Sequence, residues 1–405
     1  MEILLWILAA AWMAIAVLTT VTAWRYAQGL PFPEVPQTAP PAAVLVAIKG
    51  VSDLSRSFFA RLRHQSYPAY RVIAAVESED DPAFLMLKEE SKKPGAPLRI
   101  VIAGLADRTG QKVWNLLATL DGLEPEDGIV AFADADTLPG PDWLSRLAAS
   151  LVNPGREAVT GYRWIIPADS RLSSAAVAAA NASIITLPRL PSVKNHCWGG
   201  TFAIRREALE RLSIRRSWEG AFSDDAQMTL ACKEARVPVF SPRQSLLLSP
   251  VAMNWREAFS FGCRQYRIIW IHDRGLWALA AFGTLLPLTG ATAAMAMAFQ
   301  GSLAASALLA ASLMLGELRY RTRRKIFAAL WGEDAEAERL RLYWRTERWL
   351  RPIWLSFHAL CIVAAPGSRR IRWAGVEYLV RGPQDVLVLR SQPQKKAAAA
   401  PPQDG

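Results

Sequence analysis

Residues 129–136 have the sequence IVAFADAD, in which two carboxylates, Asp134 and Asp136, follow five apolar residues. The apolar run predicts a buried strand that ends at these carboxylates. Parallel α/β sheets bind their ligands at the carboxyl ends of strands. Hard divalent cations bind one or two carboxylates together with substrate phosphates, so this stretch is a candidate metal site. A turn or helix-capping pair before Pro139 is the simpler interpretation of the two aspartates alone.

Three further short apolar runs precede this strand and alternate with segments of helical character. The runs are Ala43–Ile48, Val72–Val76 and Arg99–Ala103, and the helix-like segments are Leu54–His64, Pro82–Lys92 and Gln111–Leu120. This alternation predicts a parallel α/β sheet. The absence of GxGxxG and GxxxxGK[ST] patterns argues against the usual dinucleotide-binding and P-loop classes.

The chain has two more acidic clusters, one before and one after this strand. Residues 77–82 (ESEDDP) come after the second apolar run, and the sequence SDD at 223–225 precedes a predicted helix over 226–235. In the second cluster one carboxylate is expected to cap the helix, which leaves the other for proton transfer. A plain N-cap is the alternative interpretation.

Apolar blocks on both sides of this region predict membrane segments. Residues 3–24 carry no charge, and at about 1.5 Å per residue they reach about 33 Å, enough to cross a hydrocarbon core of about 30 Å. A signal peptide is the competing interpretation, but the basic start is missing and the run is longer than an h-region. Residues 276–316 are also uncharged and predict a hairpin of two spans that turns at residues 300–302.

The charge distribution supports membrane contact on the cytoplasmic side. The chain has 47 Lys and Arg against 36 Asp and Glu, a net charge of +11, and a basic cluster over residues 319–325 follows the second apolar block. By the positive-inside tendency, the chain after the first span lies in the cytoplasm. Residues 340–349 predict a basic amphipathic helix in the headgroup plane, and residues 352–366 a re-entrant or interfacial segment. Without a nucleic-acid motif, nucleic acid is not the expected partner.

The helix predicted at residues 255–270 has an aromatic face opposite its arginines. Two interpretations remain open for that face, contact with the membrane interface or packing against the α/β domain. Arg264 and Arg267 are three residues apart, which places them on one helical face where they can clamp a phosphate. The four cysteines and four histidines show no metal-ligand spacing, so any metal site must use carboxylates.

In their order along the chain, these motifs resemble those of the inverting glycosyltransferase families 2 and 21, particularly the ceramide glucosyltransferase-like branch. The matching segments are 48–51 (IKGV), 77–83 (ESEDDPA), 111–116 (QKVWNL), 134–136 (DAD), 224–225 (DD), 264–268 (RQYRI) and 371–378 (IRWAGVEY). Residues 196–200 (HCWGG) resemble the family segment around the acceptor and donor sugar. The resemblance covers residues 42–380.

The resemblance implies an α/β protein with a GT-A (Rossmann-like) glycosyltransferase domain and with N-terminal and C-terminal transmembrane helices. It implies a UDP-sugar donor, a divalent metal (Mg2+ or Mn2+) held by Asp134 and Asp136, and Asp225 as the catalytic base beside Asp224. The remaining expected contacts are Lys49, Glu77, Asp80, Asp81, Lys112, Asp134, Gly199 and Gly200 with the donor, and Arg264, Gln265, Arg267 and Trp198 with the acceptor or the pyrophosphate.

Three positions depart from the family pattern. Ser78 stands where the first aspartate is often found, Ile268 replaces a tryptophan, and Asp224 replaces a glutamate. The expected uracil contact therefore passes to Glu77, Asp80 or Asp81. A ceramide-like acceptor is not simply carried over.

The predicted organisation has seven parts. They are a transmembrane helix (1–25), a proline-rich linker (26–41), a GT-A catalytic domain (42–252), an interfacial amphipathic helix (253–274), a transmembrane hairpin (275–320), an interfacial and re-entrant segment with a cytoplasmic strand (321–380) and a disordered tail (381–405). The expected protein is integral to the inner membrane, with its catalytic domain in the cytoplasm.

The expected activity is transfer of a hexose, with glucose as the leading guess, from a UDP-sugar to a ceramide-like or other polar lipid, with inversion. A polysaccharide synthase is the main alternative, but it needs more spans to form a channel. A non-catalytic membrane scaffold of the same fold and a transferase acting on polyprenyl phosphate also stay open.

Overall fold

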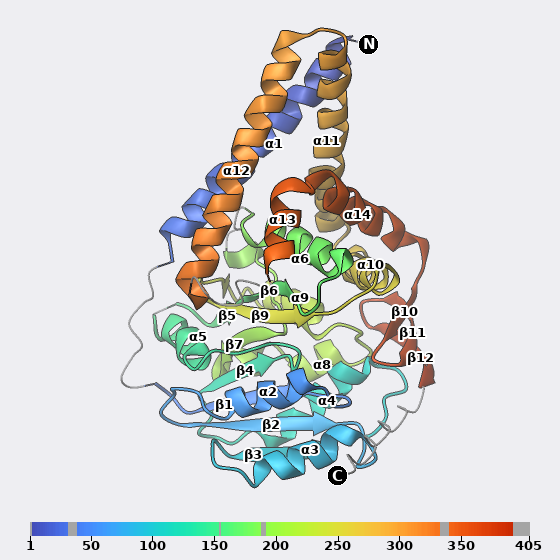
Figure 1. Ribbon diagram of the computed structural model, residues 1–405. Coiled ribbons are helices and arrows are strands. Elements are labelled where there is room, and N and C mark those ends of the chain that lie inside the picture. Colours follow the sequence, from blue (N-terminus) through green and yellow to red (C-terminus); the bar gives the residue numbers. More distant parts are fainter. Residues whose placement is uncertain (1, 31–38, 154, 188–191, 333–339, 392–405) are drawn as a thin grey trace, which may run out of the picture. The chain divides into compact units, whose positions relative to one another are not determined.

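A computed structural model describes residues 2–30, 39–153, 155–187, 192–332 and 340–391 (Figure 1). The chain forms two compact units, each built from segments far apart in the sequence. The sheet unit comprises the described parts of 36–158, 202–237 and 368–405, and the helical unit those of 1–35, 159–201 and 238–367. The predicted catalytic domain is a single run over 42–252, which does not coincide with the sheet unit. Periodicity along the chain does not reveal that residues 159–201 leave this unit and that the C-terminal strands return to it.

Parallel strands form the centre of the sheet unit, as predicted. They are β1 (Ala42–Ala47), β2 (Tyr70–Val76), β3 (Leu98–Ile102) and β4 (Ile129–Ala133), with β7 (Thr201–Arg205) beside β4, in the order β3-β2-β1-β4-β7. Val44 of β1 lies opposite Val72 of β2 and Ala131 of β4. All three residues are fully buried, which explains why these strands have near-continuous apolar sequences.

Short helices connect the strands of the sheet unit. They are α2 (Asp53–Leu62), α3 (Pro82–Ser91), α4 (Gln111–Thr119), the 3-10 turn η1 (Leu120–Gly122), α5 (Trp143–Val152), α7 (Arg206–Arg211), α8 (Ile214–Trp218) and α9 (Asp224–Glu234). Polar N-caps start three of them: Ser52 before α2, Asp81 before α3 and Ser223 before α9. Helix α4 packs on β1 and β2, which places its first turn near the carboxyl ends of those strands.

Three antiparallel strands complete the sheet unit. They are β10 (Arg370–Trp373), β11 (Val376–Gly382) and β12 (Asp385–Ser391). The rings of Trp373 and Tyr378 pack against Phe222, at 5.8 and 5.2 Å between ring centroids. The prediction of a disordered tail from residue 381 is wrong for β12, whose backbone pairs with β11 and whose Val386 is buried. Residues 392–405 of that tail lie outside the described residues.

Three long apolar helices dominate the helical unit and lie side by side (Figure 1). They are α1 (Glu2–Gln28), α11 (Arg274–Phe299) and α12 (Leu303–Trp331), and each is long and apolar enough to cross a membrane. Phe299 and Leu303, at the turn between α11 and α12, are 92% and 86% exposed. Apolar side chains on the outside of such helices are suited to lipid rather than water.

The rest of the helical unit combines short strands with four more α-helices. Its elements are β5 (Ala158–Thr160), β6 (Tyr162–Pro167), α6 (Leu172–Ile185), the 3-10 turn η2 (Ser192–Lys194), β8 (Val239–Phe240), β9 (Leu246–Val251), α10 (Trp255–His272), α13 (Arg341–Trp349), α14 (Arg351–Ala364) and the 3-10 turn η3 (Ala365–Gly367). Strands β6 and β9 pair in parallel, and Trp164, Tyr343 and Trp344 belong to the core beside them.

Several predicted features of this unit differ in the structure. Helix α12 continues to Trp331 instead of ending near residue 320, because its basic residues are good helix formers and Arg319 and Arg323 are buried. Helices α13 and α14 form a pair bent by 85°, a broken span or a re-entrant loop. Tyr343 and Trp344 of α13 face the protein core, whereas Trp349 and the three arginines of that helix are exposed.

The structure also bears on two further predictions, the linker over 26–41 and the aromatic face of the helix at 255–270. Helix α1 continues to Gln28, into the linker predicted over 26–41, and residues 31–38 of that linker lie outside the described residues. On α10, the side chains of Cys263 and Tyr266 are buried and pack against Cys361 and Ile362 of α14. The packing partner of this part of the aromatic face is therefore α14 of the helical unit.

Candidate functional site

Predicted site residues of the sheet unit gather at the carboxyl ends of adjacent strands. Lys49 follows β1, Glu77 follows β2 and Asp134 follows β4. Strand β1 lies between β2 and β4, so the chain order reverses at β1. In open α/β sheets this reversal is where ligands bind.

The ammonium of Lys112 joins two of the acidic clusters. Lys112 is the second residue of α4, and its Nζ lies 2.6 Å from Oδ1 of Asp134 and 3.0 Å from Oδ2 of Asp224. Burial acts to lower the pKa of Lys112, but the carboxylates of Asp134, Asp224 and Asp225 together hold that pKa above its usual range. Lys112 is therefore a fixed positive charge between the DAD segment and the start of α9.

Asp224 is the more enclosed member of the aspartate pair. Its residue is 5% exposed, and its carboxylate pairs with Lys112. Burial raises the pKa of Asp224 to about 6, while the charge of Lys112 acts in the opposite direction. The indole nitrogen of Trp218 donates to the backbone oxygen of Asp224 at 3.1 Å, which fixes the first turn of α9 from the core side.

Asp225 is only partly buried and uses one oxygen for local structure. Its Oδ1 accepts hydrogen bonds from the Ser223 hydroxyl and, at 2.8 Å, from the backbone N–H of Ala226. Its Oδ2 has no hydrogen-bond partner within the described residues. One carboxylate oxygen of Asp225 is thus available to accept a proton.

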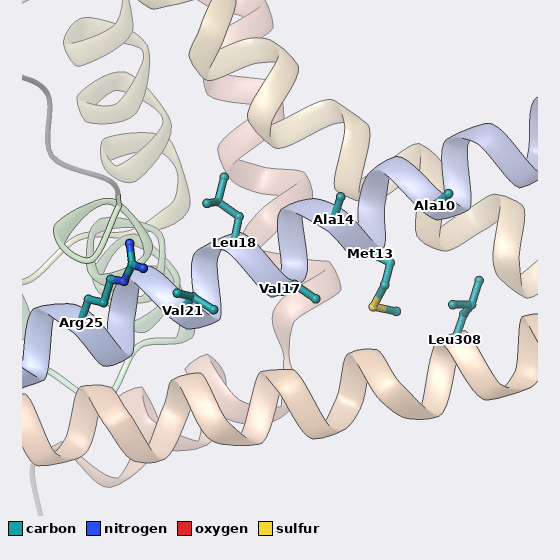
Figure 2. A pocket seen from close by; sticks show the side chains of 8 residues that line it. All are labelled: Ala10, Met13, Ala14, Val17, Leu18, Val21, Arg25 and Leu308. Carbon is teal, nitrogen blue, oxygen red and sulfur yellow. The ribbon is translucent and has the colours of Figure 1, made fainter.

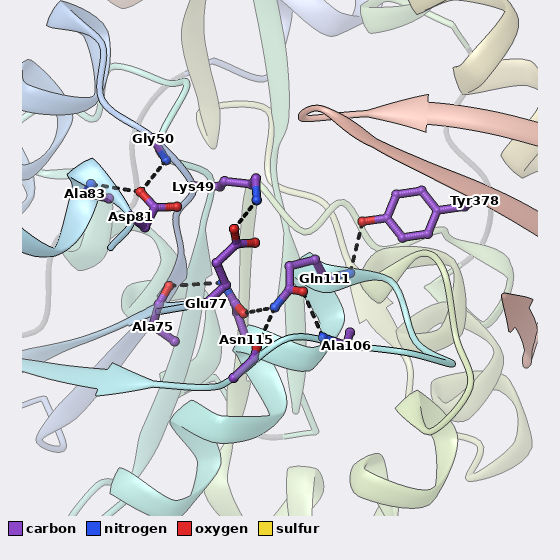
Figure 3. A network of polar contacts seen from close by, with 11 residues as sticks. Lys49, Gly50, Ala75, Glu77, Asp81, Ala83, Ala106, Gln111, Asn115 and Tyr378 are labelled. Carbon is purple, nitrogen blue, oxygen red and sulfur yellow. Dashed lines mark hydrogen bonds and ion pairs between the residues drawn. The ribbon is translucent and has the colours of Figure 1, made fainter. Parts of the chain in front are cut away.

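At the end of β2, an ion pair joins Lys49 and Glu77 (Figure 3). The second carboxylate oxygen of Glu77, Oε2, is buried and has no hydrogen-bond partner in the described structure. Buried carboxylate oxygens are normally paired, so this atom is a candidate ligand contact. Asp81 instead has a structural role, because its Oδ1 accepts from the backbone N–H groups of Gly50 and Ala83, both at 2.8 Å. Asp80 is exposed.

A buried amide network supports the first turn of α4 (Figure 3). Gln111 Nε2 donates to the backbone oxygen of Gly104 at 2.9 Å and to Asn115 Oδ1 at 2.8 Å, and the Tyr378 hydroxyl accepts from the backbone N–H of Gln111 at 3.3 Å. Neither Gln111 nor Tyr378 was predicted as a site residue. Both residues lie in segments that carry the family resemblance, and this resemblance was the one signal that pointed to them. Their contact joins distant parts of the chain, so it could not be predicted from neighbouring residues.

Asp136 lies in the loop after β4 and is exposed. Across the described ranges, no three His, Cys, Asp or Glu side chains form a group that could hold a metal ion. Two carboxylates plus phosphate oxygens are nevertheless a donor set that suits Mg2+. The residues Asp134 and Asp136 therefore fit a divalent ion only when a phosphate-bearing ligand supplies further oxygens.

The remaining predicted site residues belong to the helical unit. The backbone N–H of Trp198 donates to Thr160 Oγ1 at 2.9 Å, and the Trp198 ring packs against Tyr162 at 5.6 Å between centroids. The guanidinium of Arg163 lies 4.8 Å from the centroid of the same ring. A Cβ at Gly200 would meet the Trp198 ring at 2.3 Å, so a glycine there leaves room for the indole. Gly199 is buried in the same turn.

Arg264, Gln265 and Arg267 follow one another on α10, and all three are partly buried. Arg267 Nε donates to the backbone oxygen of Ala365 at 3.0 Å, and the Arg264 guanidinium lies 5.4 Å from the centroid of the Phe261 ring. Arg267 is thus tied to the end of α14. The structure describes these residues within the helical unit and the carboxylate clusters within the sheet unit.

A groove of about 740 Å³ follows helix α1 (Figure 2). Its lining is apolar except at one end, and consists of Ala10, Met13, Ala14, Val17, Leu18, Val21, Arg25 and Leu308. None of the predicted site residues lines it.

Comparisons with known proteins identify the family and the fold of the chain. The model of glycosyl transferase family 21 matches residues 4–385. No curated protein matches the chain. The structure of the mannosyltransferase PcManGT from Pyrobaculum calidifontis, in complex with GDP-Man and Mn2+, is 21% identical, with 81% of this chain and 97% of that chain covered and a TM-score of 0.52. This likeness confirms the predicted GT-A fold.

Two further solved structures are more distant. Glucosyl-3-phosphoglycerate synthase from M. tuberculosis is 14% identical, with 65% of this chain and 86% of that chain covered and a TM-score of 0.34. Residues 1–349 of TarS from S. aureus are 11% identical, with 87% of this chain and 100% of that chain covered and a TM-score of 0.36.

Proposed function

Because the chain belongs to glycosyltransferase family 21, we propose that it is a membrane-bound, inverting hexosyltransferase. The donor is a UDP-sugar, in the first instance UDP-glucose, and the acceptor is the hydroxyl group of a ceramide-like or other polar membrane lipid. The observation that carries this proposal is the meeting of Lys112, Asp134 and Asp224 at the carboxyl ends of parallel strands.

The diphosphate of the donor fits the cationic and metal-binding groups of this cluster. Asp134 and Asp136 would hold Mg2+ or Mn2+ together with oxygens of the diphosphate. When bound there, the metal supplies charge neutralisation for the departing diphosphate. Lys112 adds a second positive charge that needs no proton transfer, since its ammonium stays protonated at neutral pH. The mannosyltransferase from Pyrobaculum calidifontis, whose structure contains Mn2+, supports a metal-dependent reaction.

Asp225 is the proposed catalytic base. In a single displacement, a carboxylate on the side opposite the leaving group must take the proton of the acceptor hydroxyl. Oδ2 of Asp225 has no partner in the described part of the chain, whereas the carboxylate of Asp224 is paired with Lys112. Asp224 is therefore the positioning residue that holds Lys112 beside Asp134. Displacement from the opposite side inverts the anomeric configuration.

Glu77 is the proposed contact for the uracil base. Uracil presents an N3–H donor, and the unpaired Oε2 of Glu77 is a buried acceptor beside Lys49. Asp81 is engaged by two backbone N–H groups and Asp80 is exposed, so Glu77 is favoured among the three candidates.

The acceptor is proposed to come from the membrane. Three helices of the chain are long and apolar enough to cross a bilayer, which supports an acceptor that is itself a lipid. Arg264, Gln265, Arg267 and Trp198, with Gly199 and Gly200 beside the tryptophan, are proposed to contact the acceptor or the sugar diphosphate. The basic residues after the apolar part of α12 support placing the catalytic domain in the cytoplasm, at the inner membrane.

The test is transfer by the full-length protein in lipid nanodiscs. UDP-glucose, Mn2+ and a mixed lipid extract are supplied, and lipid products are identified by mass spectrometry. We expect a hexosylated lipid with the wild type and its loss on metal chelation. Asp121→Asn is the matched control for Asp225→Asn, because Asp121 forms an exposed ion pair with Arg215. Absence of product with UDP-glucose, UDP-galactose and UDP-N-acetylglucosamine, despite UDP binding, would contradict the proposal.

A further inference from the structure

Buried positive charge collects between the helices of the helical unit, outside every residue assigned to sugar transfer. Arg319 and Arg323, both on α12, are each 4% exposed. Arg351, at the start of α14, is partly buried, and its positive charge repels those of Arg319 and Arg323. The acid in this group is Glu347 of α13, which is 6% exposed. We call Arg319, Arg323, Arg351 and Glu347 the arginine cluster.

The pairing within the arginine cluster is incomplete. Nη1 of Arg323 donates to Oε1 of Glu347 at 2.6 Å, and its Nε and Nη2 lie 3.3 Å from Oγ1 of Thr186 at the end of α6. Glu347 therefore compensates one arginine. The cluster keeps two positive charges that no carboxylate of the cluster neutralises.

The missing negative charge is clearest at Arg319. Its Nη1 donates to the backbone oxygen of Ala16 at 2.8 Å and to Oγ1 of Thr20 at 2.7 Å, both on α1. Its Nη2 is buried and has no hydrogen-bond partner in the described structure. A buried guanidinium held by neutral groups alone is costly, because burial removes its hydration without supplying a counter-charge.

The missing group must accept hydrogen bonds and carry negative charge. A phosphate has both properties and is the preferred partner of the guanidinium fork. A water molecule satisfies Nη2 but leaves the charge uncompensated. Oε2 of Glu347 is also buried without a donor, and a hydroxyl next to the phosphate would supply one.

The place of Arg319 along α12 fits the headgroup level of a bilayer. It lies 16 residues after Leu303, which is about 24 Å along the helix axis, near the far side of a hydrocarbon core of about 30 Å. Basic residues continue beyond it to Lys325, on the side expected to face the cytoplasm. Basic pockets between spanning helices at this level bind anionic headgroups.

We propose that the arginine cluster, between α1, α12, α13 and α14, binds the phosphate group of an anionic lipid. The ligand inserts its phosphate against Nη2 of Arg319 and the guanidinium of Arg351, and it joins the three helices that carry Arg319, Glu347 and Arg351. This site is separate from sugar transfer and does not depend on the proposed activity.

The experiment measures lipid-dependent stability of the full-length protein in detergent micelles. Phosphatidylglycerol, phosphatidylcholine and inorganic phosphate are added in separate arms, and the thermal midpoint is recorded together with lipid retention by native mass spectrometry. We expect phosphatidylglycerol to raise the midpoint and to remain bound at one molecule per chain. A phosphatidylglycerol response without a phosphate response supports the proposed lipid site. An equal response to inorganic phosphate overturns it in favour of a soluble phosphate compound.

Variants separate a built site from general attraction between charges. Arg319→Met and Arg351→Met should each weaken retention at least about tenfold, the effect of losing one charge-assisted contact. Arg321→Gln is the matched control, because Arg321 lies on the same helix, is 68% exposed and pairs with Glu317. The control should retain the full response. The proposal is overturned if phosphatidylglycerol does not raise the midpoint of the wild type, or if Arg321→Gln weakens retention as much as Arg319→Met does.

Discussion

The hydroxyl of Tyr378 accepts a hydrogen bond from the backbone N–H of Gln111 at 3.3 Å, across 267 positions of sequence. Gln111 begins helix α4, and the next residue is Lys112, which bridges Asp134 and Asp224. A C-terminal strand thus holds the start of the helix that carries the central cation of the candidate site. This contact joins strand β11 to helix α4 within the sheet unit.

Removing this hydroxyl should weaken the stability of the protein. Tyr378 is 2% exposed, so Tyr378→Phe leaves the backbone N–H of Gln111 without its acceptor, at a cost of about 1 kcal/mol. We expect the thermal midpoint to fall by about 3 °C, measured by differential scanning fluorimetry. Tyr320→Phe is the control, because the Tyr320 ring packs on Trp344 but its hydroxyl makes no hydrogen bond with described residues. An unchanged midpoint for Tyr378→Phe would remove the structural role given to this contact.

Lys112 should control both metal binding and transfer. Lys112→Met leaves the carboxylates of Asp134 and Asp224 close together without the ammonium between them. We expect the variant to bind Mn2+ without nucleotide, because two uncompensated carboxylates attract a divalent cation. Transfer should fall about 100-fold, the usual scale for losing one electrostatic contact to a leaving group.

The matched control for Lys112 is Lys92→Met, which removes an exposed ammonium of the same unit. Titration calorimetry with Mn2+ and a transfer assay provide the two readings. If Lys112→Met transfers sugar at the wild-type rate, the bridge has no part in the reaction.

Glu77 should affect donor affinity rather than the chemical step. In Glu77→Gln the amide oxygen still pairs with Lys49, which turns the amide NH2 toward the position of Oε2. We expect the KM for the UDP-sugar to rise about tenfold with little change in kcat. The amide NH2 of the variant and the N3–H of uracil are both hydrogen-bond donors, so the proposed hydrogen bond is lost. Glu79→Gln, at an exposed position two residues on, is the control. A Glu77→Gln variant with an unchanged KM would exclude this contact.

The buried pair of Arg323 and Glu347 should govern the stability of the helical unit. Glu347→Leu removes the acid of the arginine cluster and leaves Arg323 buried without its counter-charge, at a cost of about 3 kcal/mol. The double variant Arg323→Met with Glu347→Leu should recover most of this loss, because both charges are removed together. Unfolding midpoints of the two single variants and the double variant test this, and additive losses would contradict it.

The sequence predicted the parts of the fold that depend on local pattern. Apolar runs located β1, β2, β3 and β4 within two residues of their ends, and the strand-end position of Asp134 followed from the run before it. The three long apolar helices were likewise predicted from length and hydropathy. These features need only neighbouring residues to be specified.

Features that depend on distant partners escaped prediction. The bridge from Lys112 to Asp224 joins two helices. On α13, Tyr343 and Trp344 turn inward because Trp164 and Phe327 offer a core for them. Strand β12 was predicted to be part of a disordered tail because its order comes from pairing with β11. In each case a tertiary contact, rather than local propensity, decides the structure.

Transfer by Asp225→Asn tests the central claim most directly. The substitution keeps the size of the side chain and the acceptor of the Ala226 N–H, but removes the basicity of the free oxygen. The full-length variant is compared with the wild type for UDP binding by calorimetry and for hexosylated lipid by mass spectrometry. We predict wild-type UDP affinity with transfer lowered at least about 1000-fold, within the range expected for a general base. Transfer by Asp225→Asn within a few-fold of the wild-type rate would contradict the account.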